Sequence, residues 1–150
     1  MEFELKVKLL PHFNGISLPK YATDGSAGLD LRAAIIDSIS LKPGEKIKIP
    51  TGIAISMPTK FMVGLVFARS GLASKYGLNL SNGVGVIDSD YTGEIICPIQ
   101  NCGDKEYSIH RGDRIAQLVF LPIALANLKI VKELNNTERG QGGFGSTGVV

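Results

Sequence analysis

Apolar residues recur with a period of two along most of the chain, which is the spacing of side chains on one face of a β-strand. In "ELKVKLL" (residues 4–10) the apolar positions alternate with charged ones, and "KIKIP" (46–50) and "GIAIS" (52–56) repeat the pattern. The same pattern predicts further strands at residues 61–67, 94–100, 106–110, 114–122 and 127–134. Many short strands of this kind are typical of an all-β sandwich or barrel.

Two local signals interrupt the strands. "LKPGEK" (41–46) is predicted to be a tight turn, because Pro43 fixes one central residue and Gly44 tolerates a positive φ at the next. One short helix is expected in "SGLASKYG", with Ser70 as its cap and Gly77 as its end. We therefore expect one all-β domain with a single short helix.

The C-terminal segment "TERGQGGFGSTGVV" (137–150) differs from the rest of the chain. Five of its last eleven residues are glycine, so ordering it costs much backbone entropy and buries little apolar surface. We expect a folded β-barrel body at residues 1–136 and a flexible glycine-rich C-terminal arm at 137–150, within a single domain. Arg139 and Phe144 lie among the glycines and hydroxyls, which indicates that the arm closes over something when it orders.

Length, composition and charge narrow the class of protein. The chain has 150 residues, of which 44% are hydrophobic and 20% charged, enough for one domain with a sizeable core. Its formal net charge of +2 is too small for a general binder of nucleic acid or membrane, whereas a small anionic ligand fits. Because the N-terminus is unlike a secretory signal and no stretch is long and apolar enough to span a bilayer, we expect an intracellular protein, cytoplasmic or nuclear.

The cysteines and histidines give no sign of a metal site or a disulfide framework. Cys97 and Cys102 are two thiols without zinc spacing or nearby histidines, and we expect them to be buried or idle. His12 and His110 lie far apart in the sequence, and we expect surface or satisfied-core roles for both.

Four glycine-rich interruptions carry polar residues that a plain β-barrel does not need. In "TDGSAGLDLRA" (23–33), Asp30 falls inside an apolar strand, where it acts functionally or only bonds the backbone of a turn. In "ARSGLASKYGL" (68–78), Arg69, Ser70 and the amides of a helix start would form an anion site, the alternative being ordinary capping beside a surface arginine. No GxxxxGK[ST] motif occurs, so a P-loop is excluded.

The third interruption, "NGVGVIDSDYTGEI" (82–95), predicts a β-hairpin with a functional tip. An EF-hand is excluded because the twelfth position counted from Asp88 is Ile99 and not a bidentate glutamate. A carboxylate just after a buried run is desolvated on one side, which suits Asp88 as a general base; the alternative is that Asp88 and Asp90 form Asx turns. In the fourth, "RGDRIAQLVF" (111–120), Arg114 and Gln117 interrupt an otherwise apolar strand.

Taken in order, "GSAGLDL", "RSGLASKYGL", "NGVGVIDSDYTGEI", "RGDRIAQLVF" and "RGQGGFGSTG" resemble the five motifs of the trimeric dUTP pyrophosphatases, the dUTPases. The resemblance covers the chain from about residue 23 to its end. Two positions depart from the family pattern. Ala68 stands where proline is frequent, and Gln141 stands where a small hydroxyl residue is common, which bears on one phosphate contact and not on the activity.

The resemblance implies a jelly-roll-like distorted β-barrel and a homotrimer with active sites shared between subunits. It also implies Mg²⁺-assisted hydrolysis of dUTP to dUMP and pyrophosphate, which keeps uracil out of DNA and supplies dUMP for thymidylate synthesis. By the same resemblance, uracil is held by Asn82 and by the backbone of Gly85 and Val86. Tyr91 packs under the deoxyribose, and Asp88 deprotonates the water that attacks the α-phosphorus in line with departing pyrophosphate.

The resemblance assigns the triphosphate to Arg69, Ser70, Gly71 and Gln117, with Arg114 propping the site electrostatically. No protein group is expected to bind Mg²⁺ directly, because phosphate oxygens and water hold it; Asp30 acts through the metal's waters or by holding an arginine. The arm would contribute phosphate contacts and a cover for uracil from Arg139, Phe144, Gly145, Ser146 and Thr147.

Two alternatives from other classes stay open. A binding protein without turnover would have lost Asp88 or the arm, and this chain retains both. A dCTP deaminase, a relative of similar fold, would need an acid near the cytosine amino group and usually lacks the tyrosine-bearing hairpin.

Overall fold

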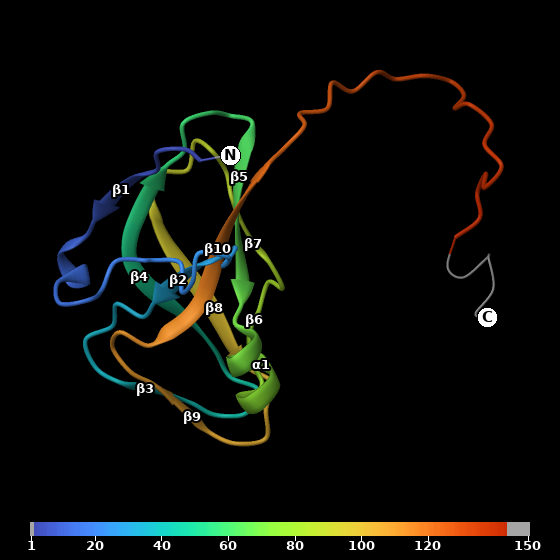
Figure 1. Cartoon of the computed structure of the whole chain (residues 1–150). Coiled ribbons are helices and arrows are strands. Elements are labelled where there is room, and N and C mark those ends of the chain that lie inside the picture. The colour runs from blue at the N-terminus through green and yellow to red at the C-terminus, as the bar shows by residue number, and fades with distance from the viewer. Residues whose placement is uncertain (1, 144–150) are drawn as a thin grey trace.

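Two four-stranded antiparallel sheets enclose the core in a computed structural model that describes residues 2–143 of the chain (Figure 1). The first sheet has the order β1 (Lys6–Leu9), β4 (Lys46–Ser56), β8 (Glu94–Asn101), β6 (Leu78–Leu80). The second has the order β2 (Leu29–Arg32), β10 (Arg114–Pro122), β5 (Met62–Ala68), β7 (Gly85–Ile87). A two-stranded sheet of β3 (Ile39–Leu41) and β9 (Tyr107–Ile109) lies at one end of the body.

Helical structure is sparse within the described residues. It consists of a 3₁₀ turn, η1 (Pro11–Phe13), and one α-helix, α1 (Ser70–Tyr76). No helix in this part of the chain has the length and apolar character needed to cross a membrane. The expected all-β fold with one short helix is confirmed.

The core follows the period of two that the sequence shows. In β8, Ile95, Cys97 and Ile99 point inward and are at most 3% exposed, whereas Ile96 between them is 46% exposed. Inward-facing residues of both large sheets, together with Ile109 of β9, form one continuous cluster, which includes Leu31, Ile49, Ile53, Val66, Ile115 and Leu118.

β4 joins two predicted strands into one strand of eleven residues with a break in register between Pro50 and Ala54. Gly52 sits at this break with φ +70°, a conformation that favours glycine. A Cβ atom there would lie 2.9 Å from the Cβ of Phe13, so the position is also crowded. The turn at 42–45 is as predicted, with Gly44 at φ +82° and the Glu45 N–H donating to the Lys42 carbonyl at 3.0 Å.

The start of α1 differs from the expectation. Arg69 is the residue before the first helical residue, and Ser70 begins the helix without its side chain capping it. Its end is as predicted, because Gly77 adopts the left-handed conformation with φ +71° and donates to the Ala73 carbonyl. The prediction of Ser70 as a cap is therefore wrong, whereas that of Gly77 is confirmed.

The predicted hairpin at 82–95 is not a two-stranded ladder. β7 pairs with β5 in the second sheet, and β8 pairs with β4 and β6 in the first. The residues between β7 and β8 thus carry the chain from one sheet to the other. An alternating pattern shows where strands lie but not which strand each one pairs with, and for this reason the prediction failed.

The predicted strand at 127–134 is also wrong for the single chain. After β10 the chain leaves the body as an extended segment, and no strand of the described chain pairs with it (Figure 1). Its apolar residues face solvent, with Leu128 90% and Ile130 99% exposed. The alternating pattern is real, but the chain itself supplies no surface to cover it.

Candidate active site

Asp30 holds two arginines at one edge of the second sheet. Its Oδ1 forms an ion pair with Nε of Arg69 at 2.9 Å, and its Oδ2 accepts a hydrogen bond from a terminal nitrogen of Arg114 at 3.1 Å. The Asp30 side chain is 17% exposed and the Arg69 side chain 26%, so this cluster is partly shielded from water. Both carboxylate oxygens are engaged by guanidinium groups. Of the two roles predicted for Asp30, the contact with arginine is the one this geometry displays.

Strand pairing brings these residues together from three distant parts of the sequence. β10 lies between β2 and β5, so that Gln117 stands opposite Asp30 on one side and Phe67 on the other. Ala116 pairs with Ala68, the residue directly before Arg69. The two polar residues that interrupt the apolar pattern of β10 therefore lie beside the polar residue that interrupts β2.

Gln117 is oriented by its own contacts. Its side-chain amide donates to the Ala68 carbonyl at 3.1 Å, and its side chain packs against Gly28. A Cβ atom on Gly28 would lie 2.9 Å from Oε1 of Gln117, so a larger residue would displace the amide. The glycine of "GSAGLDL" next to β2 thus makes room for a side chain of the fourth motif.

A hollow in the surface gathers this group of predicted residues. It is lined by Ala22, Ser26, Ala27, Gly28, Asp30, Arg69, Ser70, Gly71, Arg114, Gln117 and Val119. Two guanidinium groups face one carboxylate, which leaves one positive charge in excess. An anion with several oxygen acceptors fits such a surface.

A second hollow lies beside β7 and contains the residues predicted to read the base. It is lined by Lys48, Val66, Leu80, Asn82, Gly85, Val86, Ile87, Ile96 and Pro98. Gly85 lies so close to β5 that an added Cβ would be 3.1 Å from the Cβ of Val66. A flat ring could thus approach backbone groups and apolar side chains together.

Asp88 and Tyr91 lie on the connection between β7 and β8. The Tyr91 N–H donates to the Asp88 carbonyl at 3.1 Å, and its hydroxyl donates to the Glu94 carbonyl at 2.8 Å. Asp88 is exposed, as are Val86 at 62% and Tyr91 at 44%. The expectation that Asp88 follows a buried run is wrong for the single chain, because the run before it lies on the surface.

The predicted residues thus fall into separate groups on one chain, and neither hollow shares a lining residue with the other. Arg139 lies in the exposed segment after β10, where its Nε donates to the Gly142 carbonyl at 2.9 Å. The other predicted arm residues, Phe144, Gly145, Ser146 and Thr147, lie outside the described residues.

Sequence reasoning missed residues that hold the site in place. Glu94 and Gly28 lie inside two of the motifs, so their place in the sequence could have indicated a role in the site. Their residue types alone gave no such indication. Arg111 opens the fourth motif, and its guanidinium bridges the carbonyls of His12, Asn14 and Ile35. No periodicity or spacing pointed to His12, whose Nε2 lies 2.7 Å from Oε1 of Glu94.

Asp30 and Asp88 are the carboxylates among the predicted site residues of the body. Within residues 2–143 no group of three or more His, Cys, Asp or Glu side chains could hold a metal ion. Mg²⁺ retains waters and commonly takes one or two carboxylates together with phosphate oxygens. Asp30, which lines the first hollow, and the exposed Asp88 are carboxylates of this kind.

Comparisons with known proteins agree with this geometry. The family description dUTPase matches residues 14–148. A deoxyuridine 5'-triphosphate nucleotidohydrolase of Desulfitobacterium hafniense is 54% identical over 132 residues, covering 88% of this chain and 87% of that protein. One of Shewanella woodyi is 49% identical over 150 residues, covering 99% of both.

Solved structures show the same similarity. The dUTPase of Staphylococcus bacteriophage 80alpha with dUpNHpp superposes with a TM-score of 0.87 at 34% identity, covering 97% of this chain and 99% of that one. A mutant dUTPase of phage phi11, described with a structural Mg(II) ion, has a TM-score of 0.78 at 30% identity over 87% of this chain and 98% of that one. The expected jelly-roll-like β fold is confirmed, and the chain belongs to the dUTPase family.

Proposed function

We propose that the protein hydrolyses dUTP to dUMP and pyrophosphate. The observation that carries this proposal is the Asp30–Arg69–Arg114 cluster beside Gln117, an anion site in a chain of the dUTPase family. The bound ligand of the phage 80alpha relative, dUpNHpp, supports a uracil nucleotide as substrate. Removing dUTP keeps uracil out of DNA, and the product dUMP supplies thymidylate synthesis.

The triphosphate binds at the hollow between β2, β10 and the start of α1. Arg69 contributes a guanidinium already oriented by Asp30, so little side-chain entropy is lost when phosphate arrives. Ser70, Gly71 and Gln117 line the same hollow and donate hydrogen bonds. Arg114 adds charge from behind Asp30, which makes it a positioning residue for the anion site.

Asp88 acts as the general base. It orients a water and takes its proton while the water's oxygen forms a bond to the α-phosphorus. The bond from the α-phosphorus to the bridging oxygen breaks in line, and its electron pair leaves with pyrophosphate. No covalent intermediate on the protein is required.

Base and sugar are selected at the β7 segment. Asn82 and the backbone of Gly85 and Val86 hydrogen-bond uracil; cytosine reverses the donor and acceptor pattern at position 4 and would leave buried groups unpaired. The Tyr91 ring packs under the deoxyribose, where a 2′-hydroxyl finds neither space nor a partner.

Mg²⁺ accompanies the substrate, held by phosphate oxygens and water. When bound, it would neutralise charge on the triphosphate and on pyrophosphate. Asp30 would meet it only through a water, because both of its carboxylate oxygens already pair with Arg69 and Arg114. The phage phi11 relative with its structural Mg(II) supports a role for this ion in the family.

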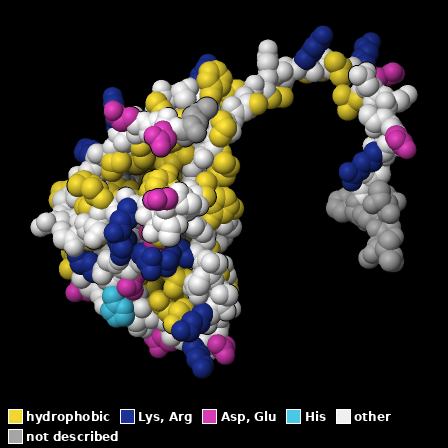
Figure 2. All heavy atoms as spheres, viewed as in Figure 1, with side chains coloured by type: hydrophobic (Ala, Val, Ile, Leu, Met, Phe, Trp, Pro, Cys, Tyr) yellow, Lys and Arg dark blue, Asp and Glu magenta, His cyan; other side chains and the backbone are white. Residues whose placement is uncertain are grey.

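The active protein is a homotrimer with sites shared between subunits. Two features support this proposal: the separate phosphate and base hollows, and the apolar residues of 123–134 that one chain leaves uncovered (Figure 2). In the trimer these residues pack on a neighbouring subunit. This packing brings the arm, residues 137–150, to a site formed by other subunits. There Phe144 covers uracil, and Gly145 lets the backbone approach the ligand. The phosphates are bound by Arg139, Ser146 and Thr147.

A direct assay tests the proposed function. The purified protein is incubated with each deoxynucleoside triphosphate and Mg²⁺, and pyrophosphate and ammonia are both measured. We expect pyrophosphate from dUTP and none from the others. Ammonia from dCTP would identify a deaminase, and binding of dUTP without either product would identify a binding protein.

A further inference from the structure

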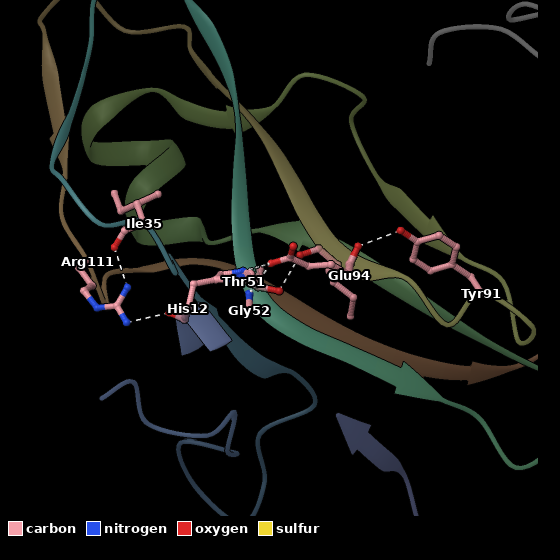
Figure 3. Close-up of polar contacts among 8 residues, drawn as sticks. His12, Ile35, Thr51, Gly52, Tyr91, Glu94 and Arg111 are labelled. Atoms are coloured by element: carbon pink, nitrogen blue, oxygen red, sulfur yellow. Dashed lines mark hydrogen bonds and ion pairs between the residues drawn. The ribbon is translucent and has the colours of Figure 1, made fainter. Parts of the chain in front are cut away.

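Tyr91, the proposed sugar-reading residue, is held at its hydroxyl by one particular backbone carbonyl. The hydroxyl donates to the carbonyl of Glu94, three residues further on, at 2.8 Å (Figure 3). The ring also sits close to Gly93, where an added Cβ would lie 2.6 Å from the hydroxyl oxygen. Since Tyr91 is 44% exposed, surrounding side chains do little to fix the ring, and this hydrogen bond sets its direction.

The Glu94 carbonyl is in turn fixed by the side chain of the same residue. Oε1 of Glu94 accepts from the Gly52 N–H at 2.7 Å and lies 2.7 Å from Nε2 of His12 (Figure 3). Gly52 is at the register break of β4, where its positive φ turns the N–H toward Glu94 instead of along the ladder. Figure 3 shows Glu94 between these two groups and Tyr91, so a single residue joins the body to the tyrosine.

His12 is itself anchored to the body. Arg111, in the turn between β9 and β10, donates to the His12 carbonyl at 2.7 Å and to the Ile35 carbonyl at 2.7 Å. Phe13, the next residue, is 5% exposed and belongs to the core. A carboxylate paired with a fixed imidazole and a fixed N–H has little freedom to move, because both partners belong to packed elements.

We infer that Glu94 is a positioning residue that sets the Tyr91 ring, through its anchored side chain and its own carbonyl, and thereby the preference for deoxyribose over ribose. This inference rests on the proposed function and adds Glu94, with His12 and Gly52 behind it, to the residues that determine sugar specificity. In this role the carboxylate acts through Tyr91 and does not contact the substrate. Loss of the anchor releases the start of β8, the carbonyl moves, and the ring no longer closes the space beside C2′.

The test compares kcat/KM for dUTP with kcat/KM for UTP in a small set of variants. Glu94→Ala is expected to lower this ratio by about 10-fold, the usual range for losing one orienting hydrogen bond. Tyr91→Phe keeps the ring and removes only the hydroxyl, and should lower the ratio by a similar factor. The double variant should lose no more than either single variant, since both act through one contact.

If Glu94→Ala folds poorly, two further variants still test the inference. Glu94→Gln retains the acceptor oxygen for Gly52 and should restore most of the ratio. Gly93→Ala leaves the carboxylate intact but pushes the hydroxyl from the Glu94 carbonyl, and should lower the ratio by itself. The affinities of UMP and dUMP, measured by calorimetry, report the same discrimination without turnover.

Thr51→Val is the matched control. The Thr51 hydroxyl donates at 2.6 Å to the carbonyl of Ile95, the residue after Glu94. Within residues 2–143 it forms no hydrogen bond with Tyr91 or with Glu94. It should lower the melting temperature and leave the ratio unchanged. A Glu94→Ala protein that is destabilised but discriminates like the parent would overturn the inference, as would additive losses in the double variant. Absence of dUTP hydrolysis by the parent protein would instead refute the proposed function.

Discussion

The hollow around Asp30 and the segment after β10 are held in place in opposite ways. In the hollow, Asp30, Arg69, Arg114 and Gln117 come from paired strands or directly follow one. The side chains of Asp30, Arg69 and Arg114 form ion pairs with one another, and Gln117 donates to the Ala68 carbonyl. The segment from 124 to 143 pairs with no strand among residues 2–143 and exposes residues as apolar as Leu128 and Ile130. One region is held in place by contacts within a single chain, whereas the other exposes an apolar surface that the described part of its own chain does not cover.

This difference separates two sources of catalytic power. A preformed anion site stabilises charge without reorganising during the reaction. A segment that orders on binding has to recover its ordering entropy from contacts made with the ligand, so it is suited to closing the site and excluding water. We therefore expect damage to the body to affect the chemical step or the fold, and damage to the arm to affect substrate binding and turnover but not the fold.

The largest expected effect lies in the body. Asp88→Asn should lower turnover by about 10² to 10⁴, the usual contribution of a positioned general base, while dUTP affinity stays close to that of the parent. Single-turnover kinetics and equilibrium binding measure the two quantities separately. Unchanged turnover would remove Asp88 from the mechanism and place the proton transfer elsewhere.

Removing residues 137–150 should have the next largest effect. We expect a loss of about 100-fold in turnover, because reacting groups that are poorly positioned and open to water lose factors of this size. The melting temperature should change by less than about 2 °C, since exposed residues contribute little to stability. Calorimetry and the pyrophosphate assay measure both quantities on the same sample.

Arg139→Ala tests the contribution of a single arm residue to phosphate binding. It should weaken dUTP binding while leaving dUMP binding nearly unchanged, since its proposed partner is a phosphate absent from the product. A truncated protein as active as the full-length chain would contradict the proposed role of the arm.

Ile130→Ala tests whether a second subunit covers the exposed segment. A buried isoleucine is worth about 1.5 to 3 kcal/mol, so association of the subunits should weaken by at least about 10-fold if Ile130 is buried in the trimer. Sedimentation at several protein concentrations measures the change. Lys129→Ala, the neighbour on the other side of the extended chain, is the control and should leave association unaltered.

The two regions also differ in how well the sequence predicts them. Alternation located β8 and β10 because burial on one face demands a period of two, and Asp30 and Gln117 were recognisable as polar breaks in apolar strands. The same alternation predicted a strand at 127–134 that the single chain does not form. A periodic pattern states that a face will be covered, but it does not name the chain that covers it.

Contacts between distant residues were beyond the reach of the sequence. Nothing in the spacing of His12, Gly52 and Glu94 indicates that they meet, since the break in β4 and the turn at η1 bring them together. The pairing of β7 with β5 was missed for a related reason, because strand order depends on packing over the whole core. The role of Gly28 could not be predicted from its residue type either, because this glycine acts by leaving space for the Gln117 side chain.

The smallest expected effect is a difference in reactivity between the two cysteine thiols, one in the core and one on the surface. It tests whether the folded body excludes solvent from its core. Cys97 is completely buried in β8, and burial raises the pKa of its thiol to about 12 from an ordinary value of 9.0. Cys102, one residue beyond the end of β8, is exposed. A thiol-reactive dye should therefore label Cys102 promptly at pH 8 and Cys97 only after unfolding, with the same result in the protein that lacks 137–150.

Because the Cys97 thiol ionises at lower pH in the unfolded chain than in the folded one, its contribution to stability is fully present below about pH 9 and is lost as the pH rises toward 12. Cys97→Ala should flatten that alkaline decline in a series of urea denaturations, whereas Cys102→Ala should not. Prompt labelling of both thiols in the native protein would show that the body opens readily, and the contrast between a preformed body and an arm that needs a partner would then fail.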